Sequence, residues 1–192
     1  MSVENKSFQL LYEAYKSLQT RKNDFRNNSL IKMVIPYIKN NNLLDIGCGA
    51  GYLLYYASLL GIKATGLEPN KKLIELSEQL YGKLDIINKF AEDLREVKSS
   101  YDTITIIDTL EHIENENKLL SDIYKILNEG GRLIINVPAM KFLYVERDKK
   151  LGDFRRYNKI DLKRLLDKNK FEIIKIKYWN FLGIFPSIIY EK

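Results

Sequence analysis

The segment from Leu43 to Leu53 reads LLDIGCGAGYL, and it determines which fold class fits the chain. Its first residues, 43–46, form a short apolar run typical of a buried strand. Gly47, Gly49 and Gly51 follow at once, and an apolar helical pattern begins directly after them. A glycine-rich turn between a strand and a helix presents free backbone N–H groups and allows a ligand to approach the main chain closely. The segment therefore predicts a ligand-binding loop in an α/β protein.

Two acidic residues narrow the choice of ligand. The dinucleotide fingerprint is G-x-G-x-x-G, whereas the glycines here are spaced G-x-G-x-G. Asp45 stands at the mouth of the loop, where a carboxylate repels a pyrophosphate but attracts an ammonium or sulfonium group. Glu68 follows at about the 20-residue distance at which an acid accepts hydrogen bonds from a ribose. A nucleoside with a cationic tail, as in S-adenosylmethionine, explains both acids, whereas a glycine turn that only packs a helix on a strand explains neither.

The overall composition is that of a globular protein, with 45% hydrophobic and 29% charged residues in a chain of 192. No apolar run approaches the roughly 18 to 20 residues of a membrane helix, and the first residues lack a signal-peptide core. Cys48 is the single cysteine and His112 the single histidine, so we expect a reducing, cytoplasmic location and no His-rich metal cage. The net charge of +6 suits an anionic partner, but the lysines are scattered, which favours a solvated surface.

Strand and helix patterns alternate along the chain without a repeat or a linker. Helices are expected at 7–19, 29–39, 52–60, 70–81, 115–127 and 158–169, and strands at 43–46, 62–67, 84–88, 103–107, 132–137 and 171–178. Asn70 is the expected N-cap of its helix, and Asn158 with Asp161 resembles a capping box. Such alternation predicts a parallel sheet covered on both faces, with a ligand beyond the carboxyl ends of the strands.

Five segments resemble the successive motifs of class I S-adenosylmethionine-dependent methyltransferases, in the family's order and spacing, over about residues 40 to 140. They read LLDIGCGAG, GLEPN, FAEDL, IIDTLEHI and GGRLIINVPA. The resemblance implies a Rossmann-like fold with a seven-stranded, mostly parallel sheet of order 3-2-1-4-5-7-6 and helices on both faces. It also implies one methyltransferase domain over 1–192, with N-terminal helices at 1–40, a cofactor-binding core at 41–138 and a substrate lid with C-terminal strands at 139–192.

The resemblance assigns cofactor roles to individual positions. Asp45, Gly47 and Gly49 would hold the methionine end of S-adenosylmethionine, Glu68 the ribose, and Pro69 would lie near the adenine. Further predicted contacts are Cys48 and Gly51 in the loop, Ile107 beside the reacting methyl group, and Arg26, which would reach the cofactor carboxylate.

Residues 90–92 fall where the family flanks the adenine ring. The backbone N–H of Ala91 would face a ring nitrogen. Many relatives have an aspartate at the position of Phe90, so Glu92 or Asp93 would have to supply the contact with the exocyclic amine.

The segment after the fourth predicted strand, Asp108-Thr-Leu-Glu111-His112, carries the catalytic candidates Asp108 and His112. Methyl transfer depends largely on positioning, so it requires few catalytic groups. The segment lacks the Pro-Pro-aromatic run that accompanies methylation of adenine amino groups. It resembles the Glu-x-x-Glu-His segment with which ubiquinone-type and small-RNA 2′-O-methyltransferases coordinate a divalent cation. The alternatives are a structural contact to the helix or cofactor loop, which we favour, and a general base at His112; we expect no metal.

The segment that follows the fifth predicted strand resembles a substrate lid. Its Gly152-Asp-Phe-Arg-Arg-Tyr157 run is similar to a Gly-His-aromatic-Arg-Arg-Tyr segment of methyltransferases encoded with sugar and polyprenol-linked glycan enzymes, with Asp153 in place of the histidine. Paired arginines suit a phosphate or carboxylate, but one of them could instead pair with Asp148 or Asp153 to hold the lid. The predicted acceptor-binding residues are Tyr144, Arg155, Arg156 and Tyr157.

These features together predict methyl transfer from S-adenosylmethionine to a small-molecule acceptor, on oxygen in preference to nitrogen or carbon. The acceptor is expected to be anionic or linked to a glycan or lipid, and no DNA partner is expected. An RNA methyltransferase, a non-catalytic cofactor-binding protein and a nicotinamide-dependent oxidoreductase are the alternatives. The sequence leaves open the oligomeric state and the role of the apolar segment at 181–190, as a seventh strand, an aromatic wall or a membrane-facing edge.

Overall fold

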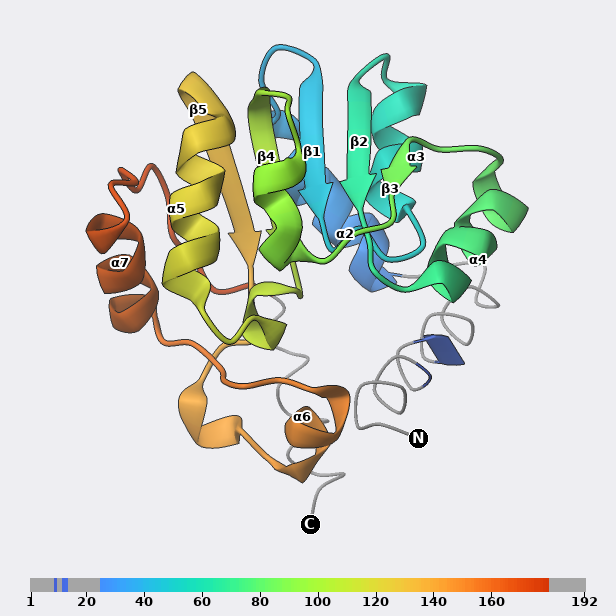
Figure 1. Cartoon of the computed structure of the whole chain (residues 1–192). Coiled ribbons are helices and arrows are strands. Elements are labelled where there is room, and N and C mark those ends of the chain that lie inside the picture. Colours follow the sequence, from blue (N-terminus) through green and yellow to red (C-terminus); the bar gives the residue numbers. More distant parts are fainter. Residues whose placement is uncertain (1–8, 10–11, 14–24, 180–192) are drawn as a thin grey trace.

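A five-stranded sheet forms the centre of the computed structural model, which describes residues 9, 12–13 and 25–179 (Figure 1). The strand order is β3-β2-β1-β4-β5, and every neighbouring pair is parallel. The strands are β1 (Asn42–Ile46), β2 (Lys63–Leu67), β3 (Ile86–Ile87), β4 (Tyr101–Ile107) and β5 (Leu127–Asn136). The order reverses between β1 and β4, and a parallel sheet binds its ligand beyond the strand ends at such a point.

The predicted order of the first five strands is confirmed, but the predicted seven strands are not. Residues 171–178 were expected to form a strand, and the structure has none there. Alternating apolar residues become a strand only when a neighbouring strand pairs their backbone groups, and Ile174 of this segment is 75% exposed. The segment 181–190, considered as strand seven, lies outside the described residues.

Helices cover the sheet on both faces, as predicted. In Figure 1, α2 and α3 lie behind the sheet and α5 lies in front of it. The α-helices are α2 (Phe25–Val34), α3 (Tyr52–Leu59), α4 (Lys71–Tyr81), α5 (Glu116–Ile126), α6 (Glu146–Leu151) and α7 (Lys159–Lys168). The 3₁₀ helices are η1 (Ile35–Tyr37), η2 (Ala91–Glu96), η3 (Leu110–His112) and η4 (Lys141–Leu143).

The side chains of Asn70 and Asn115 cap α4 and α5, whereas no side chain caps α7. The side chain of Asn70 accepts a hydrogen bond from the Lys72 amide of α4 (3.1 Å), as predicted. The capping box predicted at Asn158 is wrong, because no side-chain bond caps α7. Asn158 instead accepts from the Lys141 amide (3.5 Å), and Asp161 forms an ion pair with the Lys141 side chain (2.7 Å). The two polar residues therefore hold η4 against α7.

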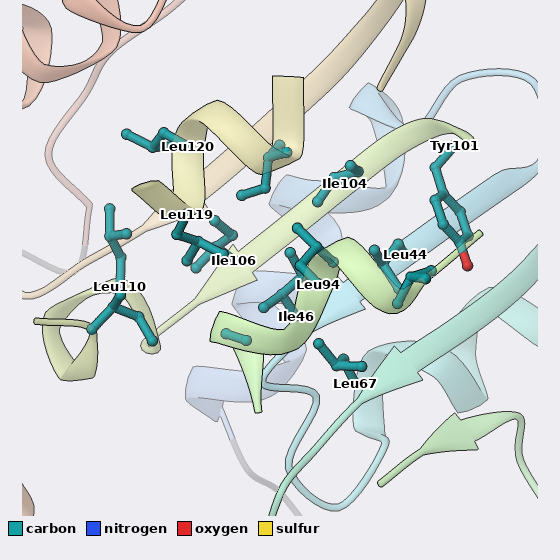
Figure 2. Packing of buried hydrophobic residues seen from close by; sticks show 14 of the residues in the cluster. Leu44, Ile46, Leu67, Leu94, Tyr101, Ile104, Ile106, Leu110, Leu119 and Leu120 are labelled. Carbon is teal, nitrogen blue, oxygen red and sulfur yellow. The ribbon is translucent and has the colours of Figure 1, made fainter. Parts of the chain in front are cut away.

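The larger hydrophobic core lies between the sheet and α5 (Figure 2). Alternate residues of a strand point to the same face, so Leu44 and Ile46 of β1 share this core with Ile104 and Ile106 of β4. Leu43 points the other way, into a second cluster with α2 and α3. Because β1 is anchored on both faces, the loop that follows Ile46 begins from a fixed position. No helix among the described residues is long and apolar enough to cross a membrane.

Candidate active site

The loop between β1 and α3 has the conformation that its glycines permit. Gly47, Gly49 and Gly51 have φ angles of +73°, +56° and +75°, which side-chain-bearing residues rarely adopt. The amide of Gly47 donates to the carbonyl of Leu67 (2.8 Å) and so ties the loop to the end of β2. A Cβ atom on Gly47 would lie 2.2 Å from Oγ1 of Thr109. The loop is therefore in contact with the segment that follows β4.

Two of the predicted loop residues face the protein interior. Cys48 is buried against Gly66 of β2, where an added Cβ would lie 2.5 Å from the Cys48 sulfur. Burial raises the pKa of the Cys48 thiol, which keeps it neutral. A Cβ on Gly51 would lie 2.7 Å from Oγ of Ser77 in α4. The amides of these two residues also donate within the protein, Cys48 to the carbonyl of Leu67 (3.1 Å) and Gly51 to the carbonyl of Cys48 (2.9 Å).

Asp45 is a buried carboxyl group at the carboxyl end of β1, 4% exposed. Its Oδ1 accepts a hydrogen bond from Oγ1 of Thr105 in β4 (2.6 Å). Burial raises the pKa of Asp45 to about 7, aided by the charge of Glu68 and opposed by the Thr105 hydrogen bond. A carboxyl group in this state gains from a nearby cation, because the cation stabilises the ionised form.

Glu68 joins the glycine loop to the start of α4. Its Oε2 accepts from the Gly49 amide (3.0 Å) and its Oε1 from the Asn70 amide (2.8 Å). Burial raises the pKa of Glu68, and these two amide hydrogen bonds oppose the shift. Each carboxylate oxygen keeps a lone pair for a ribose hydroxyl. The glycine loop, Asp45 and Glu68 therefore fit S-adenosylmethionine.

We expect the Glu68→Ala variant to bind S-adenosylmethionine more weakly by roughly 1 to 3 kcal/mol, because two charge-assisted hydrogen bonds to the ribose are lost. Its melting temperature should also fall, since the buried amides of Gly49 and Asn70 lose their acceptor. Titration calorimetry and thermal unfolding measure the two effects. Glu68→Gln retains one acceptor oxygen and should give an intermediate loss. A dissociation constant of Glu68→Ala equal to that of the wild type would show that Glu68 does not bind the ribose.

The residues predicted to flank the adenine lie on the same edge of the sheet. Nδ2 of Asn88 donates to the carbonyls of Glu68 and Pro69 (2.9 Å each), which fixes the turn after β2. Ala91, the first residue of η2, is buried, whereas Phe90 is 45% exposed. The side chain of Glu92 is exposed as well. The adenine-side roles of these residues remain predictions.

The end of β4 is held by a residue that the sequence reasoning missed. Asp108, which follows Ile107, has a φ of +47°. Its amide donates to the carbonyl of Asn136 (2.9 Å), and Nδ2 of Asn136 donates to Oδ1 of Asp108 (2.8 Å). Asn136 is a polar residue at the carboxyl end of β5, the same signal that identified Asp45. Arg26 belongs to α2, but its side chain lies outside the described part of the chain.

Residues 108–112 resemble a segment that coordinates a divalent cation in other methyltransferases, but these residues do not form a metal-binding cluster. Within the described residues, no group of three or more His, Cys, Asp or Glu side chains could hold a metal ion. His112 instead lies with Nδ1 3.1 Å from Oδ1 of Asp153 in the lid. Burial raises the pKa of Asp153, and the charge of His112 opposes that shift.

The lid, defined here as residues 139–157, returns to the sheet at η3. The amide of Phe154 donates to the carbonyl of Glu111 (2.8 Å), and the amide of Met140 donates to the carbonyl of Tyr157 (3.0 Å). The hydroxyl of Tyr144 donates to the carbonyl of Asp153 (2.7 Å). These bonds place the lid over the carboxyl ends of the strands, at the lower edge of the sheet in Figure 1.

Both arginines predicted to meet the acceptor form ion pairs within the protein. Arg156 binds buried Asp148 through two bonds, Nε to Oδ2 (2.8 Å) and Nη2 to Oδ1 (2.7 Å). Arg155 binds Oε2 of Glu116 at the start of α5 (2.6 Å). The buried Tyr157 donates to the same oxygen (2.8 Å). The pairing of an arginine with Asp148, which the sequence offered as an alternative role, is therefore found for Arg156. The predicted contacts with an acceptor remain predictions for Arg155, Arg156, Tyr157 and Tyr144.

A hollow of about 470 Å³ lies at the start of α5, lined by residues 114–117 and Arg155. It includes none of the residues predicted to hold the cofactor. We therefore place the candidate site at the glycine loop, where the chemistry of the side chains fits the ligand.

We expect Arg156→Ala to lower the free energy of unfolding by roughly 2 to 3 kcal/mol, because Asp148 stays buried without its partner. Burial raises the pKa of Asp148, but the hydrogen bonds from Arg156 and the Val145 amide, together with the charges of Arg156 and Arg147, outweigh burial and leave the pKa below its ordinary value of 3.8. The loss should therefore shrink as the pH falls below 3.8. Lys149→Ala, which breaks an exposed pair with Glu146 on the same helix, is the matched control and should cost little. Equal denaturant midpoints for Arg156→Ala and the wild type would contradict a structural role.

Comparison with known proteins decides the family. A family model described as a methyltransferase domain matches residues 21–176. The chain belongs to this methyltransferase family. The predicted family is thereby confirmed, and a solved methyltransferase of the same fold contains S-adenosylmethionine, the predicted cofactor.

Two curated relatives illustrate the range of similarity. The chain is 30% identical over 146 residues to an uncharacterized protein of Haemophilus influenzae, over 71% of this chain and 58% of that protein. It is 29% identical over 105 residues to the ubiquinone biosynthesis O-methyltransferase of Vibrio atlanticus, over 52% of this chain and 44% of the enzyme. The methyltransferase chain thus spans about half the length of the curated relatives that it matches.

Solved structures support the fold. A S-adenosylmethionine-dependent methyltransferase from Archaeoglobus fulgidus has a TM-score of 0.65 at 21% identity, covering 86% of this chain and 85% of the other. Magnesium protoporphyrin IX methyltransferase from Synechocystis, with bound S-adenosylmethionine, has a TM-score of 0.58 at 20% identity, covering 83% and 71%. At these identities the similarity establishes the Rossmann-like fold alone.

Proposed function

We propose that this domain transfers the methyl group of S-adenosylmethionine to an oxygen atom of a small molecule. The observation that carries the proposal is the buried carboxyl group of Asp45 beside a loop whose three glycines adopt positive φ angles. Asp45 suits the cationic methionine end, and Glu68 suits the ribose. The ubiquinone biosynthesis O-methyltransferases among the relatives support oxygen as the accepting atom.

The bound cofactor would supply a methyl group attached to a positively charged sulfur, and that sulfur is a good leaving group. The protein therefore chiefly has to position the acceptor. Asp45 and Glu68 would fix the two ends of the cofactor. Asp108 and His112, after β4, would lie on the acceptor side, under the lid. The lid would keep water away from the reacting atoms.

The surface of the lid supports an acceptor with an apolar part. Phe142 is 79% exposed and Phe154 is 51% exposed. The charges of Arg155 and Arg156 are already balanced by Glu116 and Asp148. Among the acceptors expected from the sequence, a lipid-linked one therefore fits this lid better than a free anion, and an aromatic hydroxyl, which the sequence did not predict, fits it for the same reason.

A panel of acceptors tests the proposal, with formation of S-adenosylhomocysteine as the readout. It should contain catechols, hydroxylated quinols, a polyprenyl phosphate sugar, histamine as an amine, and a structured RNA. Turnover with hydroxyl acceptors alone is the expected result. Turnover with the amine alone would contradict oxygen as the accepting atom, and salt-sensitive turnover with RNA would favour the RNA alternative. Cofactor binding without turnover on any member would favour the non-catalytic alternative, and binding of NAD in its place would favour the oxidoreductase.

A further inference from the structure

We propose that Asp153 positions His112 as the base that removes the proton from the acceptor hydroxyl. This inference rests on the proposed function and assigns a residue to its proton transfer. Oδ1 of Asp153 lies 3.1 Å from Nδ1 of His112, although the two residues come from the lid and from η3. The sequence marked Asp153 as a departure from a histidine and as one of two candidate partners for the lid arginines, and not as a partner of His112.

The pair is held by the backbone on both sides. The amide of Phe154, next to Asp153, donates to the carbonyl of Glu111, next to His112 (2.8 Å). The hydroxyl of Tyr144 fixes the carbonyl of Asp153 itself (2.7 Å). The Asp153 side chain is 9% exposed, whereas that of His112 is 27% exposed. The carboxyl group is therefore covered, and the imidazole keeps an accessible side.

The segment that carries His112 is in contact with the loop predicted to hold the cofactor. His112 ends the short helix that begins two residues after Asp108. Thr109, between them, is in contact with Gly47 of the glycine loop, as the 2.2 Å approach of an added Cβ shows. The carboxyl ends of β1 and β4 thus bring the segment that carries His112 to the glycine loop, beside which we expect the acceptor to bind.

The chemistry follows from the hydrogen bond. When Nδ1–H of neutral His112 donates to the Asp153 carboxylate, the lone pair of Nε2 is left to accept a proton. As the acceptor oxygen bonds to the methyl carbon and the bond from sulfur to that carbon breaks, the hydroxyl proton passes to Nε2. The cofactor becomes a neutral thioether, and partly exposed His112 returns the proton to solvent.

Other charged groups act on the same pair. Asp108 and Asp148 lie within electrostatic range of Asp153, as does Arg156. The charges of the two carboxylates raise the pKa of Asp153, and the charge of the guanidinium lowers it. The pH dependence of the reaction therefore reflects the whole group, and the test includes a readout other than titration.

The tautomer of His112 provides that readout, because it is the single histidine of the chain. Nitrogen-15 NMR of the ligand-free protein at pH 8 should show Nδ1 protonated and Nε2 unprotonated. Asp153→Ala should shift the imidazole toward the Nε2-protonated form, and Asp153→Glu should restore the original form in part. Glu146→Gln, on the exposed side of the lid, should leave the signals unchanged. A wild-type imidazole protonated on Nε2, or one that ignores Asp153→Ala, would overturn the inference without bearing on the proposed function.

Steady-state kinetics with catechol as the acceptor provide a second test of the roles of His112 and Asp153. His112→Gln should lower kcat by about 100-fold or more, and Asp153→Ala by about tenfold, while calorimetry shows unchanged binding of S-adenosylmethionine. The acidic limb of the pH profile should move in Asp153→Ala. With 4-nitrocatechol, whose hydroxyl ionises far more readily, both losses should shrink. Equal losses on the two catechols would show a structural role for the pair, whereas absence of turnover by the wild type on the whole acceptor panel would count against the proposed function.

Discussion

Asp45→Asn is expected to make the ligand-free protein more stable and, at the same time, to weaken its binding of S-adenosylmethionine. The folded-state pKa of Asp45, about 7, lies above its ordinary value of 3.8. The folded protein therefore binds more protons than the unfolded chain between these pH values, and this group's contribution to stability falls as the pH rises through that window. Above pH 7 the cost is on the order of 4 kcal/mol at most. Asparagine carries no charge and keeps an oxygen for Thr105.

Melting temperatures measured from pH 4 to 9 test the expected gain in stability. The variant should exceed the wild type at pH 8, and the difference should shrink toward pH 4. Glu129→Gln changes an exposed carboxylate and should show neither effect. Equal stability of Asp45→Asn and the wild type at pH 8 would show that Asp45 bears no buried charge.

Calorimetry at pH 8 tests the expected loss of affinity for S-adenosylmethionine. Loss of a charged hydrogen-bond partner should weaken cofactor binding by roughly 2 to 3 kcal/mol, about 30- to 150-fold. In the wild type, affinity should fall below pH 7, and binding near that pH should release a proton, visible as a heat that depends on the buffer. Binding of equal strength by the variant would remove Asp45 from the cofactor site.

Gly49→Val is expected to abolish cofactor binding, with a loss of more than 100-fold. The φ of Gly49 is +56°, and its amide binds Glu68 beneath the proposed ligand, so a branched side chain would fill the space that the ligand needs. Calorimetry with S-adenosylmethionine measures the loss.

Backbone strain alone could damage the loop, and Gly61→Val controls for it. Gly61 has a φ of +72°, and nothing lies within 4 Å of an added Cβ. This variant should lose stability to a comparable extent and bind the cofactor normally. Cofactor binding by folded Gly49→Val at wild-type strength would mean that the loop does not approach the ligand.

Local patterns in the sequence predicted the parts of the fold that local forces determine. The strand at β1 and the cap at Asn70 depend on nearby residues, and both are confirmed. The expected cap at Asn158 failed because Lys141, distant in sequence, competes for its side chain. The expected strand at 171–178 failed because a strand also needs a partner, and its own apolar alternation does not supply one.

In the candidate site too, the features that depend on nearby residues were predicted better than those that depend on residues distant in sequence. Asp45 and Glu68 could be found because each ends a strand beside a loop of recognisable composition. The pairing of His112 with Asp153 depends on how the lid folds back over η3, and the sequence did not predict it. For the paired arginines the sequence offered Asp148 and Asp153 as partners, and the three-dimensional arrangement selects Asp148 for Arg156.

The carboxylate of Glu68 has one more consequence. Since it already holds the amides of Gly49 and Asn70, the two loops on either side of the proposed ribose position are joined before any ligand arrives. A preorganised site loses little conformational entropy on binding, so cofactor association should be fast and should barely alter the dynamics of these loops. Hydrogen exchange at the Gly49 and Asn70 amides should be slow in the free protein. Cofactor capture is then expected to be faster than the steps that position the acceptor, and those steps would set the pace of turnover.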